Sequence, residues 1–218
     1  MPRHYLDPKE IGAPSAQIEV ERLPKRVRDF GHYPDIGLLQ PGDLILVSPV
    51  VKKGNAKVIE GVQANRHNPF DAQWIHAATY LGDNSLVEID QGGVGVDDLH
   101  KYVPTHRLLF RRAMGLDSKP VDEATGFRIA IAALKSFKTK YAFPDLIRIY
   151  FQTRRWAEAD YRFRLRASEA ICSDFYNDAV AGVLGRGAAS AKRNPFTPAD
   201  LAASKNMQDI HTKWAPLP

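Results

Sequence analysis

A single thiol is the first side chain in this sequence that could act as a nucleophile. Cys172 is the only cysteine among 218 residues, which excludes an intrachain disulfide and a zinc site built from several cysteines. It stands near the start of SEAICSDFYNDAVAGVLG, whose apolar residues recur at helical spacing behind Ser168, a candidate N-cap. Backbone N–H groups and the dipole at a helix N-terminus stabilise a thiolate. Cys172 is therefore either a nucleophile or a small buried hydrophobe.

A thiol nucleophile needs an imidazole to take its proton and a polar group to orient that imidazole. Among the seven histidines, His76 alone lies within an apolar strand pattern, WIHAATYLG. If the turn that follows centres on Gly82, Glu88 lies directly opposite His76, about 5 Å away at Cβ. Taken alone, His76 could equally be a core histidine and Glu88 a solvent-facing carboxylate. Asp90 and His100 are the alternatives for the orienting residue.

The elements that must position these side chains change in character along the chain. Strand patterns come first, and a polar connection from Lys53 to Ala72 separates the first strand from the rest. From Asp122 onward the apolar spacing becomes helical, with a predicted buried stripe of Phe127, Ile131, Leu134 and Phe137. Strands followed by helices predict an α+β fold. A helical turn is expected at DDLHKYV, and Thr197 is expected to cap a short helix in TPADLAAS. The predicted strand segments are Asp43–Val51, WIHAATYLG, SLVEID, GGVGV and HRLLFRRA.

Composition indicates one globular domain behind an extension. Hydrophobic residues make up 44% of the chain and charged residues 25%, which excludes disordered and fibrous classes. Prolines interrupt residues 1–37, which we interpret as an N-terminal extension, and residues 38–218 as the domain. No apolar run approaches the ~20 residues of a membrane span, and the first residues lack a signal-peptide core. We therefore expect a cytoplasmic protein, or one exported without a signal peptide.

The order of motifs resembles a known family of thiol enzymes. GDLILVS, WIHAATYLGDNSLVEID, a GV segment, RLLFRR, ICSDFYNDAV and TPADLAAS follow one another as in the circularly permuted NlpC-type papain-like cysteine peptidases, the YiiX-like proteins. In that family a histidine lies on a strand that continues to Tyr and Gly, and a polar residue follows twelve positions later. Here these positions are His76 and Glu88, and the nucleophile motif comes last, at Cys172. The resemblance covers about residues 38–204.

The resemblance implies a permuted papain-like fold, in which a small antiparallel sheet packs against helices and the nucleophile opens a helix. Cys172 would attack an amide or ester carbonyl and form an acyl-thioester, His76 would transfer the proton, and Glu88 would orient His76. The substrate would be a cell-wall-type peptide or an acyl lipid. The alternatives are an acyltransferase of the same fold and an inactive binding module for an anionic partner. No metal or cofactor is implied. Tyr80 and Ser173 are expected to contact the substrate.

A basic, aromatic insertion interrupts the domain at about residues 141–166. It holds six arginines against three acidic residues, interleaved with tyrosine, phenylalanine and tryptophan. The insertion is either a solvated helix face or a wall that receives an anionic substrate, with Arg154 and Arg155 as substrate contacts. No groove-reading motif accompanies it, so we do not expect specific binding of nucleic acid.

Overall fold

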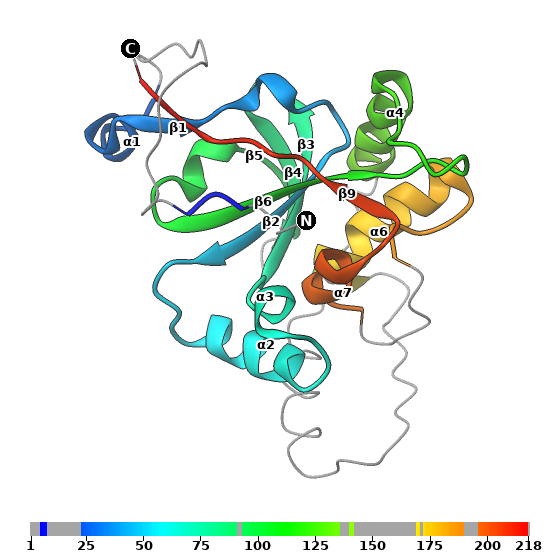
Figure 1. Cartoon of the computed structure of the whole chain (residues 1–218), viewed down its shortest axis with the longest axis horizontal. Helices are drawn as coiled ribbons and strands as arrows, with labels where there is room; N and C mark the ends of the chain where they lie inside the picture. The colour runs from blue at the N-terminus through cyan, green and yellow to red at the C-terminus, as the bar shows by residue number, and fades with distance from the viewer. Residues whose placement is uncertain are drawn as a thin grey trace.

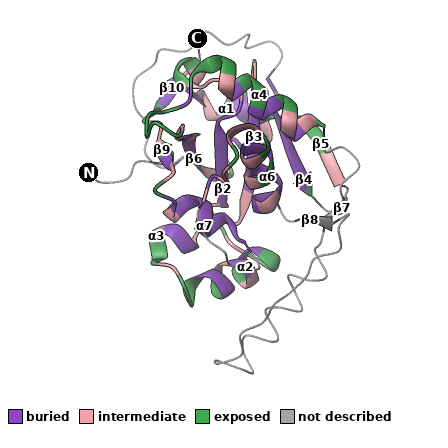
Figure 2. Ribbon diagram, turned by 90° about the vertical axis from the view of Figure 1, so that its right-hand side faces the viewer, coloured by how far each residue is buried: buried purple, intermediate pink, exposed green. Residues whose placement is uncertain are grey.

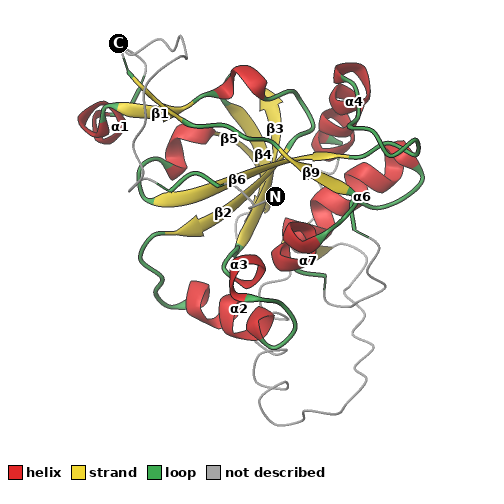
Figure 3. Cartoon of the chain, in the orientation of Figure 1, coloured by secondary structure: helices red, strands yellow, loops and turns green. Residues whose placement is uncertain are grey.

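A six-stranded antiparallel sheet forms the centre of the protein, and helices cover it (Figure 1). This is a computed structural model, and it describes residues 5–7, 23–90, 93–135, 140–141, 169–170, 172–189 and 196–217. The mixed architecture in Figure 3 confirms the predicted α+β class. The insertion at 141–166, with the helix expected within it, lies almost entirely outside the described residues.

The sheet has the strand order β5-β4-β3-β2-β6-β9, and the predicted strands form five of its members. The sixth strand is short and comes from the C-terminal end of the chain. The central strands β2 and β3 pair antiparallel, with Val47 opposite His76. The strands are β2 (Leu44–Pro49), β3 (His76–Gly82), β4 (Ser85–Asp90), β5 (Gly93–Asp98), β6 (His106–Ala113) and β9 (Met207–Asp209).

Both faces of the sheet are covered, because side chains along each strand alternate between two hydrophobic clusters. In β2, Leu44 and Leu46 belong to the first cluster, which packs against α4 (Glu123–Leu134), α6 (Cys172–Leu184) and α7 (Pro198–Ala203). Ile45 and Val47 belong to the second cluster, which packs against α1 (Lys25–Phe30), η3 (Leu99–Tyr102), β1 (His32–Pro34) and β10 (Trp214–Pro216). Figure 2 shows the resulting buried strands between partly exposed helices.

The described part of the N-terminal extension packs into the domain. Leu6 forms a bridge with Leu108 of β6, and β1 pairs with β10. Val27 and Tyr33 are fully buried in the second cluster. We interpreted this segment as an extension outside the domain because its prolines interrupt regular structure. These prolines do not prevent single apolar residues from filling the core.

Helix α4 begins where the sequence predicts, but its buried face differs from the prediction. Asp122 caps it by accepting a hydrogen bond from the Thr125 N–H (2.9 Å). The predicted stripe holds only in part, because Phe127 is 54% exposed whereas Leu134 packs against the first cluster, and Phe137 lies outside the described residues. The helix buries Gly126, Ile129, Ala130 and Ala133. A Cβ on Gly126 would clash with the carbonyl oxygen of Pro41. The helix therefore approaches the neighbouring backbone through its small residues, an approach that a bulky face would prevent.

Two other helix predictions also need correction. Helix α6 begins at Cys172, later than predicted, because Glu169–Ala170 form strand β8, which pairs in parallel with β7 (Lys140–Tyr141). The predicted cap, Ser168, lies outside the described residues. The connection predicted at Lys53–Ala72 contains helices α2 (Asn55–Ala64) and α3 (Pro69–Ala72).

Helix α7 carries the predicted cap, in which Thr197 and Asp200 form a capping box. None of the helices within the described ranges is long and apolar enough to cross a membrane.

Candidate active site

The hairpin of β3 and β4 sets the positions of His76 and Glu88. Asp83 and Asn84 form the turn with positive φ values of 47° and 63°, and the register shifts between Tyr80 and Gly82. Glu88 is consequently opposite Ala78, so the predicted register that paired it with His76 is wrong. The error is two residues, and side chains alternate with a period of two, so His76 and Glu88 still share one face as diagonal neighbours.

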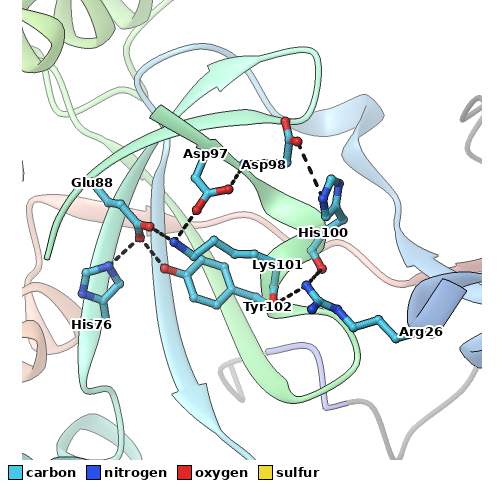
Figure 4. A network of polar contacts seen from close by, with 8 residues as sticks. All are labelled: Arg26, His76, Glu88, Asp97, Asp98, His100, Lys101 and Tyr102. Atoms are coloured by element: carbon cyan, nitrogen blue, oxygen red, sulfur yellow. Dashed lines mark hydrogen bonds and ion pairs between the residues drawn. The ribbon is translucent and has the colours of Figure 1, made fainter. Parts of the chain in front are cut away.

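Diagonal placement brings the two side chains into direct contact. The distance from His76 Nε2 to Glu88 Oε2 is 2.6 Å (Figure 4). Both side chains are largely shielded, with 17% of the His76 side chain and 4% of the Glu88 side chain exposed. A carboxylate in this position fixes the imidazole in one orientation and stabilises its protonated form.

Two residues that the sequence analysis missed also bind Glu88. Lys101 donates to Oε1, and the Tyr102 hydroxyl donates to Oε2, the oxygen that also contacts His76. Lys101 in addition contacts Asp97 Oδ2 at 2.7 Å. Both residues lie on the short helix η3, at the place where the sequence predicted a helical turn. No spacing pattern in the sequence relates this segment to Glu88, so the sequence did not indicate that Lys101 and Tyr102 contact it.

These contacts leave the carboxyl group of Glu88 ionised. Burial raises its pKa, but the hydrogen bonds and charge of His76 and the hydrogen bonds of Lys101 and Tyr102 outweigh burial and lower the pKa to about 2. The pKa of His76 is raised although burial lowers it, because the charge and hydrogen bond of Cys172 and those of Glu88 prevail. A negative carboxylate and a positive imidazolium are therefore the favoured forms at neutral pH.

Cys172 is the second partner of His76. It is the first residue of α6, is 3% exposed and belongs to the first core cluster. Helix α6 packs against β3 and β4, which brings the start of the helix to the strands that carry His76 and Glu88. Because Glu88 occupies Nε2 of His76, the Nδ1 atom is left for the thiol.

Of the other residues considered for the site, Asp90 lines the same cavity as His76 and Glu88, whereas Tyr80 and His100 do not. His100 contacts Asp98 at 3.6 Å, and Asp90 is exposed at the end of β4 on the rim of the cavity beside the site. Tyr80 is 3% exposed in the second core cluster, where its hydroxyl accepts a hydrogen bond from the Asn84 N–H. The structure therefore does not bring Tyr80 to the site.

Ser173 is adjacent to Cys172, but its side chain is directed into the core. It is fully buried, and its hydroxyl donates to the Phe196 carbonyl oxygen at 2.7 Å. Arg154 and Arg155 lie outside the described residues. Of the predicted substrate contacts, none is placed at the site by the part of the chain that the structure describes.

A cavity of about 280 Å³ opens beside His76 and Glu88. Its apolar lining comes from strand β2, helix α2 and Ile75 just before β3, and its polar lining includes the groups of the site. Helix α2 contributes Asn55 and Ile59, which the sequence analysis placed in a polar connection. The remaining lining residues are Val47, Ile75, Asp90, Lys101, Tyr102 and His106. Among the described residues, no group of three or more His, Cys, Asp or Glu side chains could hold a metal ion.

Comparison of the sequence with models of known protein families and with curated proteins gives no match.

The lowered pKa of Glu88 predicts how acid affects stability. A carboxyl group whose pKa falls from 4.5 unfolded to about 2 folded stabilises the protein above pH 4.5, and this stabilisation is lost as pH falls toward 2. The raised pKa of His76 acts in the opposite sense, stabilising below pH 6.5 and losing that effect as pH rises. Glu88→Gln should cost on the order of 3 kcal/mol at pH 5.5, and less as pH falls below 4.5.

Denaturant unfolding at several pH values measures this effect. The control is Glu60→Gln, which removes the carboxylate that pairs with Lys52 and is 35% exposed. A half-exposed pair contributes at most about 1 kcal/mol. A cost for Glu88→Gln that did not change between pH 5.5 and pH 2.5 would contradict the assignment of Glu88 as an ionised partner.

Proposed function

We propose that this protein is a cysteine hydrolase that cleaves an amide or ester bond, with Cys172 as nucleophile. One observation carries the proposal: His76 interacts with Glu88 through Nε2 and has Cys172 as its other partner. Cys172 is far from His76 in the sequence, so chain proximity does not explain the contact. Acyl transfer through a thioester requires a thiol that contacts an imidazole, and a carboxylate that orients this imidazole from its other side.

The reaction proceeds in two stages. The Cys172 sulfur attacks the substrate carbonyl carbon while His76 holds the thiol proton, and the backbone N–H of Cys172 at the start of α6 donates to the oxyanion. Collapse of the tetrahedral intermediate breaks the bond to the leaving group, which receives the proton from His76. Water, deprotonated by His76, then attacks the thioester and releases the acid and the thiol. Glu88 holds the imidazole throughout.

We assign the chain to the permuted papain-like class, of the YiiX-like branch. An antiparallel sheet with His76 on a central strand and helix α6 beginning at Cys172 supports this assignment. The chain order, in which the histidine strand precedes the nucleophile helix, is the order of that branch. The fold's first core cluster joins α6 to β3 and β4, which is how such a fold brings the two groups together.

The cavity favours a substrate that carries an apolar group next to its reactive carbonyl. Val47, Ile59 and Ile75 supply the apolar wall, and a volume of about 280 Å³ suits a side chain or a short acyl chain. A peptide amide or an acyl ester meets this description. Transfer to an amine or alcohol instead of water is a different outcome of the same thioester chemistry.

Alkylation by iodoacetamide tests the proposal without a known substrate. We expect Cys172 to react faster in the wild type than in His76→Ala at neutral pH, because the imidazole can take the thiol proton. His76→Ala should react only at higher pH. A wild-type thiol that reacts no faster than that of His76→Ala at every pH would contradict the proposal.

Turnover is tested by screening wild type against Cys172→Ala on peptidoglycan fragments and on phospholipids. Product formed only by the wild type identifies the substrate class, and product that requires an added amine or alcohol identifies an acyltransferase. An activated thiol with no turnover on either class would favour a binding module.

A further inference from the structure

Tyr102 is placed to act on the His76–Glu88 pair. Its hydroxyl donates to Oε2 of Glu88, the same oxygen that His76 contacts, and Lys101 occupies Oε1 (Figure 4). The ring of Tyr102 lies beside the His76 ring, with 6.3 Å between centroids and an interplanar angle of 47°. Tyr102 is only 6% exposed, so its hydroxyl has little water to bond instead. Its two contacts therefore fix both members of the pair.

The charged groups around this pair come from five elements. Cys172 of α6 faces His76, Lys101 of η3 and Asp97 of β5 neighbour Glu88, and His106 of β6 stacks edge-on against Tyr102 at 5.2 Å. Asp90 at the end of β4 lines the same cavity. The positive charge of Lys101 is shared between Glu88 and Asp97, so it neutralises Glu88 only in part. A neutral donor such as the Tyr102 hydroxyl can hold the carboxylate without cancelling the charge that His76 needs.

We infer that Tyr102 is a positioning residue of the site, whose hydroxyl holds the Glu88 carboxylate in the orientation that aims His76 at Cys172. This inference rests on the proposed function. It assigns a role to a residue that the motifs of the sequence did not suggest. Without the hydroxyl, the Glu88 carboxylate can rotate about its last bond, and the imidazole loses its fixed orientation.

Tyr102→Phe tests this role, with Tyr33→Phe as a matched control. Tyr33 is a fully buried tyrosine of the second core cluster, and its hydroxyl has no hydrogen-bond partner among the described residues. Both variants lose one buried hydroxyl and keep the ring. The expected result for Tyr102→Phe is a fall in kcat of about 10-fold, the size that follows from a lost hydrogen bond to a charged group, with KM unchanged. Tyr33→Phe should keep wild-type kcat.

The pH profile separates positioning from a purely structural role. The Tyr102 hydroxyl lowers the pKa of Glu88, so its removal should move the acidic limb of kcat to higher pH. Lys101→Met removes the donor on the other oxygen and should move the limb in the same direction. Lys25→Met, which removes a surface pair with Asp29, should leave the limb in place.

Each outcome decides one question. If wild-type Cys172 is activated in the alkylation assay and Tyr102→Phe matches the wild type in kcat and pH profile, the inference is overturned while the proposed function survives. A rise in KM at constant kcat would make Tyr102 a substrate contact and would also overturn it. If the wild-type thiol is not activated at all, the proposed function itself fails. Should Tyr102→Phe not fold, the Lys101→Met profile decides.

Discussion

Replacing Cys172 by alanine should lower kcat by on the order of 10⁴-fold or more and leave the fold intact. The large loss follows because no other group within the described residues is placed to form the thioester, and removal of a nucleophile that works as a unit with its base abolishes most of the rate enhancement. The thiol is small and lies at the start of α6, so the alanine variant should lose only about 1 kcal/mol of stability.

Turnover, thermal unfolding and intact mass together measure this result. Wild type quenched during turnover should carry the mass of the acyl group on Cys172, and the alanine variant should carry none. Cys172→Ser keeps a hydroxyl of similar size in the same place and is the control for packing. Full activity in Cys172→Ala would end the cysteine hydrolase proposal, and an unfolded variant would return Cys172 to the role of a core residue.

Replacing His76 by alanine should lower kcat by about 10²- to 10⁴-fold, the range that general acid–base catalysis contributes. The variant should also be less stable than wild type, because Glu88 loses one of its three hydrogen-bond donors and remains a buried carboxylate. Combining the change with Cys172→Ala should add little to the loss of activity, since the two groups act on one bond.

Steady-state kinetics of the single and double variants measure this coupling. His100→Ala is the control, because His100 was one of the two alternatives for the orienting position and contacts Asp98 instead. We expect it to keep wild-type kcat. Equal losses in His76→Ala and His100→Ala would contradict the site, as would fully additive losses in the double variant.

The sequence predicted those parts of the site that depend on local patterns. Strand alternation placed His76 and Glu88 on one face, and this holds because a register error of two residues preserves the face. The error arose from the turn, since Asp83 and Asn84 both take positive φ and an irregularity follows Tyr80, which no residue pattern announced. Helical spacing and apolar content likewise predicted the helix that carries Cys172.

What depends on packing between distant segments could not be predicted. Lys101 and Tyr102 join Glu88 because β5 returns the chain past β4 and η3 follows it, a path that composition does not reveal. Helix α2 was missed since no side chain caps its start, where Gly54 has a positive φ. Helix α4 turns Gly126 inward because the backbone of Pro41, on another segment, lies too close for a larger side chain.

The two faces of the sheet meet at this site. Cys172 belongs to the first core cluster, whereas Tyr102 belongs to the second, and His76 at the first residue of β3 joins them. In the proposed mechanism, Cys172 and His76 are therefore aligned only while the elements on both faces are docked on the sheet. Partial opening on either face would lower the reactivity of the thiol before the strands separate. If Cys172 acts as proposed, its rate of alkylation should therefore report the docking of these elements and fall before secondary structure is lost.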